Sequence, residues 1–355
     1  MTDMITESTG RWILDRPNSY IGRSVPRPNA PRLAEGQGTF VDDIELKRMV
    51  HAAFVRSPHA HARIKGIDTA AAKEMPGVVA VVTPQEMAEI CTPWVGVLTH
   101  LEGLKSAPQY PLPLDTARWQ GEAIVAVVAN SRAEAEDAAA LVDIDWEVLP
   151  VATDAEKALD ADPPVIHESL GDNLAWKRNA DFGDVDAAYA DADHVIEDTF
   201  VFGRHTGVCL ETRGLVADYE SAEEQLTVWH NNQCPHMIQN ILATHYGLEE
   251  HRVRVITRDV GGSFGIKVHT YADEVTTVGL SIMLKRPVKF IADRLESFTS
   301  DIHARDHRIK GKIAVKTDGT ITAFEIDDLT GVGPYSMYPR TSAIEANQVV
   351  NMIGG

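Results

Sequence analysis

The sequence predicts an α+β (mixed α/β) fold, and three observations support that prediction. Ala123–Ala129 is a continuous apolar run, which is typical of a strand buried on both faces. Ser131 then offers a helix cap, so we expect a helix over Ala133–Val142. Further along, Gln225–Trp229 and Val253–Thr257 have strand patterns, and each is followed by a turn and a helical pattern.

The composition is that of a globular protein. The chain has 355 residues, of which 44% are hydrophobic, so it can bury a substantial core in two or three domains. Asp and Glu total 52 against 33 Lys and Arg, which gives a formal net charge of −19. This acidity argues against a nucleic-acid partner, because such binding depends on basic side chains that neutralise phosphates.

Residues 1–20 lack the apolar core of a secretory signal, and no apolar run is long enough to span a bilayer. We therefore expect a cytoplasmic protein with no membrane span. The three cysteines, Cys91, Cys209 and Cys234, lie far apart, which excludes a disulfide framework and any Cys-x-x-Cys cluster. An iron–sulfur centre that served this protein would have to lie on another chain.

The chain divides into four predicted regions. Residues 1–30 form an arm, because prolines at positions 17, 26, 28 and 31 disfavour regular structure, while Tyr20–Arg23 offers one contact point. The other regions are a small domain over residues 31–150, an acidic connecting segment over 151–195 and a second domain over 196–355.

Local signals place the remaining elements. Asp68 is a helix cap, Asp273 and Glu274 complement the dipole of a helix start, and Thr317–Gly319 forms a hairpin turn. The further predicted strands are Met49–Arg56, Val78–Thr83, Asp143–Trp146, His194–Phe202, Val288–Ile291, Arg308–Val315 and Thr320–Asp328. The further predicted helices are Asp68–Glu74, Asp184–Ala190 and Tyr271–Lys285.

A glycine-rich loop, Val260–Lys267, separates a predicted strand from a predicted helix. Glycines at 261, 262 and 265 free the backbone for positive φ and for close approach to a ligand. A helix start just downstream would offer unpaired N–H groups to an anion. The spacing matches neither the Walker A nor the Rossmann fingerprint. From these residues alone, a structural turn and a ligand loop fit equally well.

A second polar turn, Trp229–His236, contains Gln233 and follows the preceding strand. Two successive strand–turn–helix units put both turns at strand ends, where open α/β sites form.

Two histidine patterns suggest chemistry less strongly. His59 and His61 stand in a loop with no other Cys or His nearby, so we expect structural roles and no metal. His205 and Glu211 could form an acid–base pair, but we favour a buried loop held by Glu211 and Arg213.

Together with the segments Leu33–Asp43 and His51–Ile64, the two turns resemble the large, molybdopterin-binding subunit of the xanthine dehydrogenase, aldehyde oxidase and aerobic carbon monoxide dehydrogenase family of molybdenum hydroxylases. The resemblance runs from about Ile21 to the end. It implies an a/b hammerhead domain over residues 31–150 and a first molybdopterin-binding domain over 196–355 that is incomplete relative to the family.

The resemblance also implies site residues. In the family, the glycine loop lays backbone amides on the cofactor, and a glutamine approaches an oxo ligand of molybdenum. Gln233 would be that catalytic residue, with amides of Phe264 and Gly265 as further donors, and no side chain of this chain would bind the metal. The cofactor-binding residues would be Gly261, Gly262, Ser263, Phe264 and Gly265. The segment around Glu211 would support the site from behind.

The implied cofactor is molybdenum–molybdopterin in its cytosine dinucleotide form. Such enzymes oxidise aldehydes or N-heteroaromatic rings with oxygen from water, and the implied partners are an iron–sulfur small subunit and a FAD-binding medium subunit. Purine-oxidising members carry a glutamate at the position of Val268, so an aldehyde or another N-heterocycle is favoured as the small-molecule substrate.

The family's glutamate base belongs to a complementary C-terminal half of the large subunit, so we expect this chain to be a split or truncated subunit. The alternatives are a non-catalytic homologue or interaction protein without metal, and an ordinary nucleotide-binding α/β protein.

Overall fold

The computed structural model describes residues 24–98 and 100–338. The chain forms two compact units, residues 1–39 and residues 40–355. Within the first unit, a one-turn helix, α1 (Ala30–Ala34), has a proline in its first turn. The predicted contact point Tyr20–Arg23 and the rest of the arm before residue 24 lie outside the described residues.

The second unit is built on a seven-stranded mixed sheet in the order β10-β9-β8-β11-β1-β5-β3. Its strands are β1 (Val50–Arg56), β3 (Val78–Val82), β5 (Ala123–Ala129), β8 (Gly214–Glu220), β9 (Gln225–His230), β10 (Val253–Ile256) and β11 (Val288–Ile291). Strands from before and after residue 150 meet where β1 pairs in parallel with β11. A single sheet therefore crosses both predicted domains, whose exact bounds stay predictions.

The central strand β5 is buried along its whole length, as its apolar run predicts. Ala126 and Val128 pack in a core cluster with Leu280 of α7 (Ala272–Leu284). Val125 and Val127 pack in a separate cluster with Ala138 of α4 (Arg132–Ala139). Successive side chains of a strand point to opposite faces, so two helices on opposite faces explain why no polar residue interrupts the run.

Helix α6 (Pro235–Tyr246) supplies the core at the β10 end of the sheet. Its Ile238, Ile241 and Leu242 pack against Val228 and Val253 of two strands. Since β9 and β10 are parallel neighbours joined by α6, their carboxyl ends open at the same edge. This geometry brings together the turn after β9 and the loop after β10.

Two smaller sheets complete the unit. One has the order β4-β2-β6 and the other β13-β12-β7. Their strands are β2 (Ala62–Asp68), β4 (Thr116–Ala117), β6 (Asp143–Val148), β7 (His194–Phe202), β12 (Asp306–Val315) and β13 (Ile321–Gly331). The other α-helices are α2 (Ala70–Glu74), α3 (Pro84–Ala88), α5 (Val185–Ala190) and α8 (Arg294–Ser300).

The predicted α+β fold class is confirmed, with some local differences. The strands β2, β4 and β8 and the helices α1, α3 and α8 were not predicted. Asp68 ends β2 instead of starting the helix, although its carboxylate still accepts a hydrogen bond from the N–H of Ala70 at 2.9 Å. Ser131 caps α4 as predicted, but the helix stops at Ala139. Among the described residues, no helix is long and apolar enough to cross a membrane.

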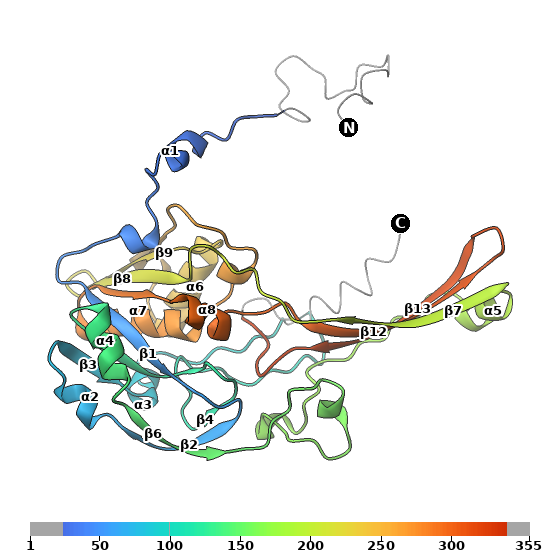
Figure 1. The fold of residues 1–355 in the computed structure, drawn as a ribbon, viewed down its shortest axis with the longest axis horizontal. Helices are drawn as coiled ribbons and strands as arrows, with labels where there is room; N and C mark the ends of the chain where they lie inside the picture. Colours follow the sequence, from blue (N-terminus) through green and yellow to red (C-terminus); the bar gives the residue numbers. More distant parts are fainter. Residues whose placement is uncertain (1–23, 99, 339–355) are drawn as a thin grey trace. The chain divides into compact units, whose positions relative to one another are not determined.

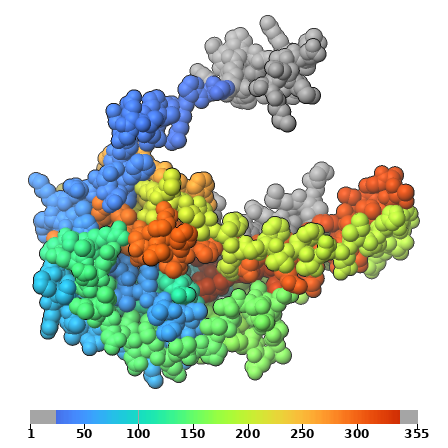
Figure 2. Space-filling view, in the orientation of Figure 1, coloured from blue at the N-terminus to red at the C-terminus, as the bar shows by residue number. Residues whose placement is uncertain are grey.

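Strand β7 is exposed at every position, and Figure 2 shows it at the surface in yellow-green. Ile196, Phe200 and Phe202 alternate along one face of the strand and are 57%, 52% and 57% exposed. Exposed apolar surface of this kind marks an interface or a site of aggregation.

We predict that the isolated chain self-associates through this surface. Light scattering over a range of concentrations should show a rising mean mass, and the variant Ile196→Thr/Phe200→Thr should shift the curve towards monomer. Threonine keeps β propensity while it removes apolar area. The control Glu197→Gln, on the opposite face, should leave the curve unchanged. A monodisperse wild-type monomer at all concentrations would contradict the prediction.

Candidate cofactor site

The glycine loop has an unusual backbone. Gly262, Phe264 and Gly265 have φ angles of +99°, +48° and +86°. Glycine adopts such angles freely, but for phenylalanine they are strained by about 1–3 kcal/mol. Phe264 is also 77% exposed, so its own packing does not compensate for the strain. The surroundings must therefore hold the loop in place.

Gln233 lies directly against this loop. The N–H of Gly265 donates to Gln233 Oε1 at 3.1 Å, and the N–H of Gln233 donates to the carbonyl of Lys267 at 2.8 Å. The two segments predicted to form one site are thus in contact. Because Oε1 accepts from the loop, the exposed Gln233 side chain keeps its Nε2 donors for another group.

The loop also offers backbone donors. Among the described residues, no hydrogen bond uses the N–H groups of Gly262, Ser263 and Phe264. Consecutive unpaired amides in a segment of mixed φ sign form an anion-binding concavity. A Cβ built on Gly265 would meet no atom within 4 Å, so the space beside it is open. These features fit an oxygen-rich, anionic cofactor such as a pterin bearing phosphate and a metal centre.

The N–H of Gly265 itself is engaged with Gln233 in this structure. Its predicted role as a direct donor to the cofactor stays a prediction, and it would require that hydrogen bond to be shared or broken.

Glu211 supports the loop from behind. Its Oε2 accepts hydrogen bonds from the N–H of Gly261 at 2.7 Å and from Nζ of Lys267 at 2.8 Å. A Cβ on Gly261 would lie 2.4 Å from Cβ of Glu211, so glycine is needed there for the approach of Glu211. The prediction of a buried loop was wrong for residues 203–205, 207–208 and 210, which are exposed, whereas Arg213 is buried as predicted.

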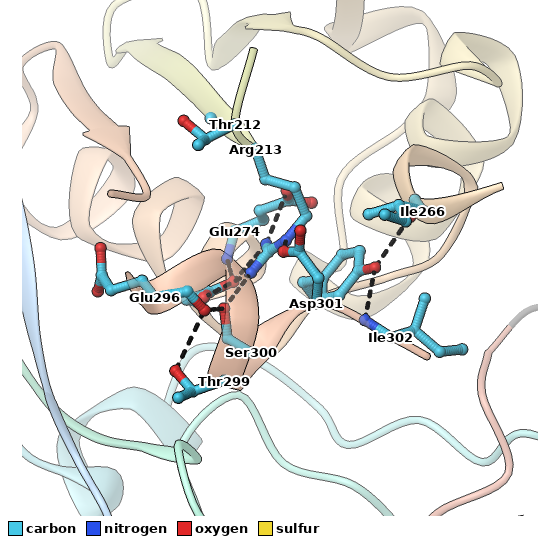
Figure 3. A network of polar contacts seen from close by, with 12 residues as sticks. Thr212, Arg213, Ile266, Glu274, Glu296, Thr299, Ser300, Asp301 and Ile302 are labelled. Atoms are coloured by element: carbon cyan, nitrogen blue, oxygen red, sulfur yellow. Dashed lines mark hydrogen bonds and ion pairs between the residues drawn. The ribbon is translucent and has the colours of Figure 1, made fainter. Parts of the chain in front are cut away.

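A buried ionic network lies beneath the site (Figure 3). The guanidinium of Arg213, 1% exposed, pairs with Asp273 at 2.9 Å, with Glu274 at 2.9 Å and with Asp301 at 2.6 Å. It also lies 3.7 Å from the centre of the Tyr271 ring. Asp273 and Glu274 begin α7 as predicted, but their buried side chains bind Arg213 in addition to facing the helix dipole.

This network reaches the glycine loop through Tyr271. Its hydroxyl donates to the carbonyl of Ile266 at 2.9 Å and accepts from the N–H of Ile302 at 3.2 Å. Burial raises the pKa of Asp273, but the positive charges of Arg213 and Arg56 outweigh that effect and hold its pKa well below its ordinary value. Asp273 is therefore ionised at neutral pH.

The other histidine candidates have structural partners. His61 Nδ1 lies 2.7 Å from the carbonyl oxygen of Pro150, and the His59 ring packs edge-on against Trp146. His205 Nδ1 lies 3.5 Å from the carbonyl oxygen of Gly203, and among the described residues the carboxylate of Glu211 binds Gly261 and Lys267. Within residues 24–98 and 100–338, no group of three or more His, Cys, Asp or Glu side chains could hold a metal ion.

Sequence reasoning missed Lys267, Tyr271 and Asp301 as supporting residues. Lys267 carried no signal in the sequence, because the burial that requires an anionic partner, at 2% exposure, is visible only in the structure. Asp301 carried none, since it lies 88 residues from Arg213 along the chain.

A strained glycine loop with free amides, placed beside a glutamine amide at the ends of two parallel strands, defines a protein that binds an anionic, oxygen-rich cofactor. Residues 166–354 match the molybdopterin cofactor-binding domain, and residues 35–150 match the aldehyde oxidase and xanthine dehydrogenase a/b hammerhead domain. The chain belongs to the molybdenum hydroxylase large-subunit family, which includes xanthine dehydrogenase, aldehyde oxidase and carbon monoxide dehydrogenase.

Several known proteins are similar. The nicotine 6-hydroxylase large subunit of Paenarthrobacter nicotinovorans is 39% identical over 94% of this chain and 41% of its own length. The crystal structure of quinoline 2-oxidoreductase from Pseudomonas putida 86 superposes with a TM-score of 0.87 at 36% identity, over 90% of this chain and 40% of that one. Carbon monoxide dehydrogenase from Oligotropha carboxidovorans gives 0.79 at 36% identity, over 86% and 39%. The chain thus spans about two fifths of these relatives.

We predict that Arg213→Met lowers the free energy of unfolding by about 3–5 kcal/mol, because it leaves buried carboxylates without their cation. Urea unfolding at neutral pH measures this. The control Arg252→Met removes exposed ion pairs with Glu224 and Glu249 and should cost at most about 1 kcal/mol. Equal costs for the two variants would show that the buried network does not hold the fold.

The same network gives a pH dependence. Asp273 has a depressed folded-state pKa, so its stabilising contribution is present above the ordinary aspartate value of about 4 and is lost as the pH falls towards the folded-state value. The stability difference between wild type and Arg213→Met should therefore shrink below about pH 4.

Proposed function

We propose that this chain is the cofactor-binding component of a molybdenum hydroxylase that oxidises an N-heteroaromatic or aldehyde substrate with water as the oxygen source. The observation that carries the proposal is the contact between Gln233 and a glycine loop that has three unpaired amides. The molybdenum–molybdopterin group, here proposed as the cytosine dinucleotide, supplies the oxidising chemistry, and the electrons pass to iron–sulfur and flavin subunits.

The chain's own residues would bind and orient the cofactor. The N–H groups of Gly262, Ser263 and Phe264 would hold anionic oxygens, and Gln233 Nε2 would donate a further hydrogen bond. Fixed donors of this kind stabilise negative charge that grows during reaction without costly rearrangement. The bond from Gly265 to Gln233 Oε1 fixes which end of the amide faces the cofactor.

Two features bear on the substrate, and the first of them favours an N-heteroaromatic ring. The relatives named nicotine 6-hydroxylase and quinoline 2-oxidoreductase are, by those names, enzymes of N-heterocycles. Val268 offers no polar anchor for a purine, and its side chain is buried. Substrate choice would also depend on the complementary part of the large subunit.

The direct test is to co-express the chain with a complementary C-terminal half and with iron–sulfur and flavin subunits of the family. Molybdenum per complex should approach one, with dye-linked oxidation of quinoline or nicotine, whereas the chain alone should hold substoichiometric metal and show no turnover. A correctly assembled complex without molybdenum would favour a non-catalytic interaction protein. Turnover by the isolated chain would refute the need for a second half.

In that complex, we predict that Gln233→Ala leaves the molybdenum content nearly unchanged and lowers turnover about 10²–10³-fold, because one donor aimed at developing charge is lost. Gln225→Ala, at an exposed strand end, is the matched control and should keep full turnover. Full activity of Gln233→Ala would mean that this amide does not face the reacting centre.

Gly265→Val should instead lower the metal content, because its side chain enters the open space beside the loop and its backbone strains at φ +86°. Gly319→Val is the matched control, since Gly319 has φ +89° and open surroundings in a distant hairpin turn. If both valine variants keep full metal, the loop is not the seat of the cofactor.

A further inference from the structure

Glu211 and Lys267 form a buried pair directly behind the glycine loop. The side chain of Lys267 is 2% exposed and that of Glu211 is 15% exposed, and their charged atoms lie 2.8 Å apart. No atom of either residue lies within 4 Å of a Cβ built on Gly265, and Nζ of Lys267 is bound to Glu211. The fold nevertheless buries a full ion pair there, at a considerable cost in desolvation.

We propose that Glu211 and Lys267 are positioning residues that hold the glycine loop in its strained, cofactor-ready conformation. Glu211 makes two hydrogen bonds to the start of the loop. Its carboxylate accepts from the N–H of Gly261, and its own N–H donates to the carbonyl of Gly261 at 3.2 Å. Both backbone groups of one glycine are thus tied to one residue of another segment.

Lys267 holds the other end of the loop. Its Nζ reaches back to the same oxygen of Glu211, while its carbonyl accepts the N–H of Gln233. The start of the loop, its end and the turn that carries Gln233 are therefore joined through two side chains. The three residues with positive φ lie between these two fixed points.

The carboxylate of Glu211 holds the loop through only one of its two oxygens. Glu211 Oε1 is buried and has no hydrogen-bond partner among the described residues, so Oε2 alone carries both bonds. Loss of either Glu211 or Lys267 should consequently release the loop, including the N–H groups of Gly265 and Ile266, whose hydrogen bonds go to other residues. A purely structural pair would instead change the stability of the whole unit.

Hydrogen–deuterium exchange of the full chain without cofactor tests this. In Glu211→Gln and in Lys267→Met, the N–H groups of Gly265 and Ile266, bonded to Gln233 and Ser263 in the wild type, should exchange at least about tenfold faster. Peptides from the buried strand β5 should exchange at the wild-type rate. Glu249→Gln, which alters an exposed ion pair with Arg252, is the control and should change neither.

The double variant Glu211→Gln/Lys267→Met separates positioning from simple charge burial. It leaves no unpaired buried charge, yet loop exchange should stay fast because the link from Lys267 to Glu211 is gone. Recovery of wild-type exchange in the double variant, or unchanged exchange in both single variants, would overturn the proposal.

The effect on catalysis rests on the proposed function, but the exchange measurement does not. A complex that never binds molybdenum would defeat the proposed function and leave the exchange result valid. Conversely, unchanged loop exchange would defeat the positioning role even if the assembled complex is an active hydroxylase.

Discussion

The guanidinium of Arg213 is the point on which the second compact unit depends. It joins three segments, because its carboxylate partners come from the first turn of α7 and from the residue after α8, while Arg213 itself immediately precedes β8. A buried arginine without anions would be too costly to keep, and three buried carboxylates without a cation would repel one another. The ionic contacts therefore fix the relative placement of elements that hydrophobic packing alone would leave free to shift.

The ionic network around Arg213 helps to position the candidate site. Tyr271 stacks on Arg213 and bonds to the carbonyl of Ile266, so the end of the glycine loop is tied to the network. Glu211 and Lys267 hold the loop by further hydrogen bonds. Gln233 accepts another from the N–H of Gly265. Strain at Phe264 is sustained because the loop is held on both sides of this residue, at Gly261 and at Gly265 and Lys267.

The arrangement also explains how one sheet serves two family domains. β1 and β11 pair in parallel across residue 150, so the hammerhead part and the cofactor-binding part share a hydrogen-bonded ladder and a common core through α7. Separate folding of either part would expose a sheet edge. The exposed β7, by contrast, belongs to a separate three-stranded sheet and leaves apolar side chains at the surface.

The sequence by itself determined the local elements and the family. The apolar run of β5, the Ser131 cap and the Asp318-Gly319 turn are local signals, and each of these elements formed where it was predicted. The glycine loop and Gln233 were likewise found from neighbouring residues. Only the tertiary structure decided what holds them, because Arg213, Asp301, Glu211 and Lys267 are joined over separations of 56 to 88 residues. Spacing along the chain carries no information about such contacts, since they arise only when β8, paired between β9 and β11, brings Glu211 and Arg213 beside the segments that follow β10 and β11.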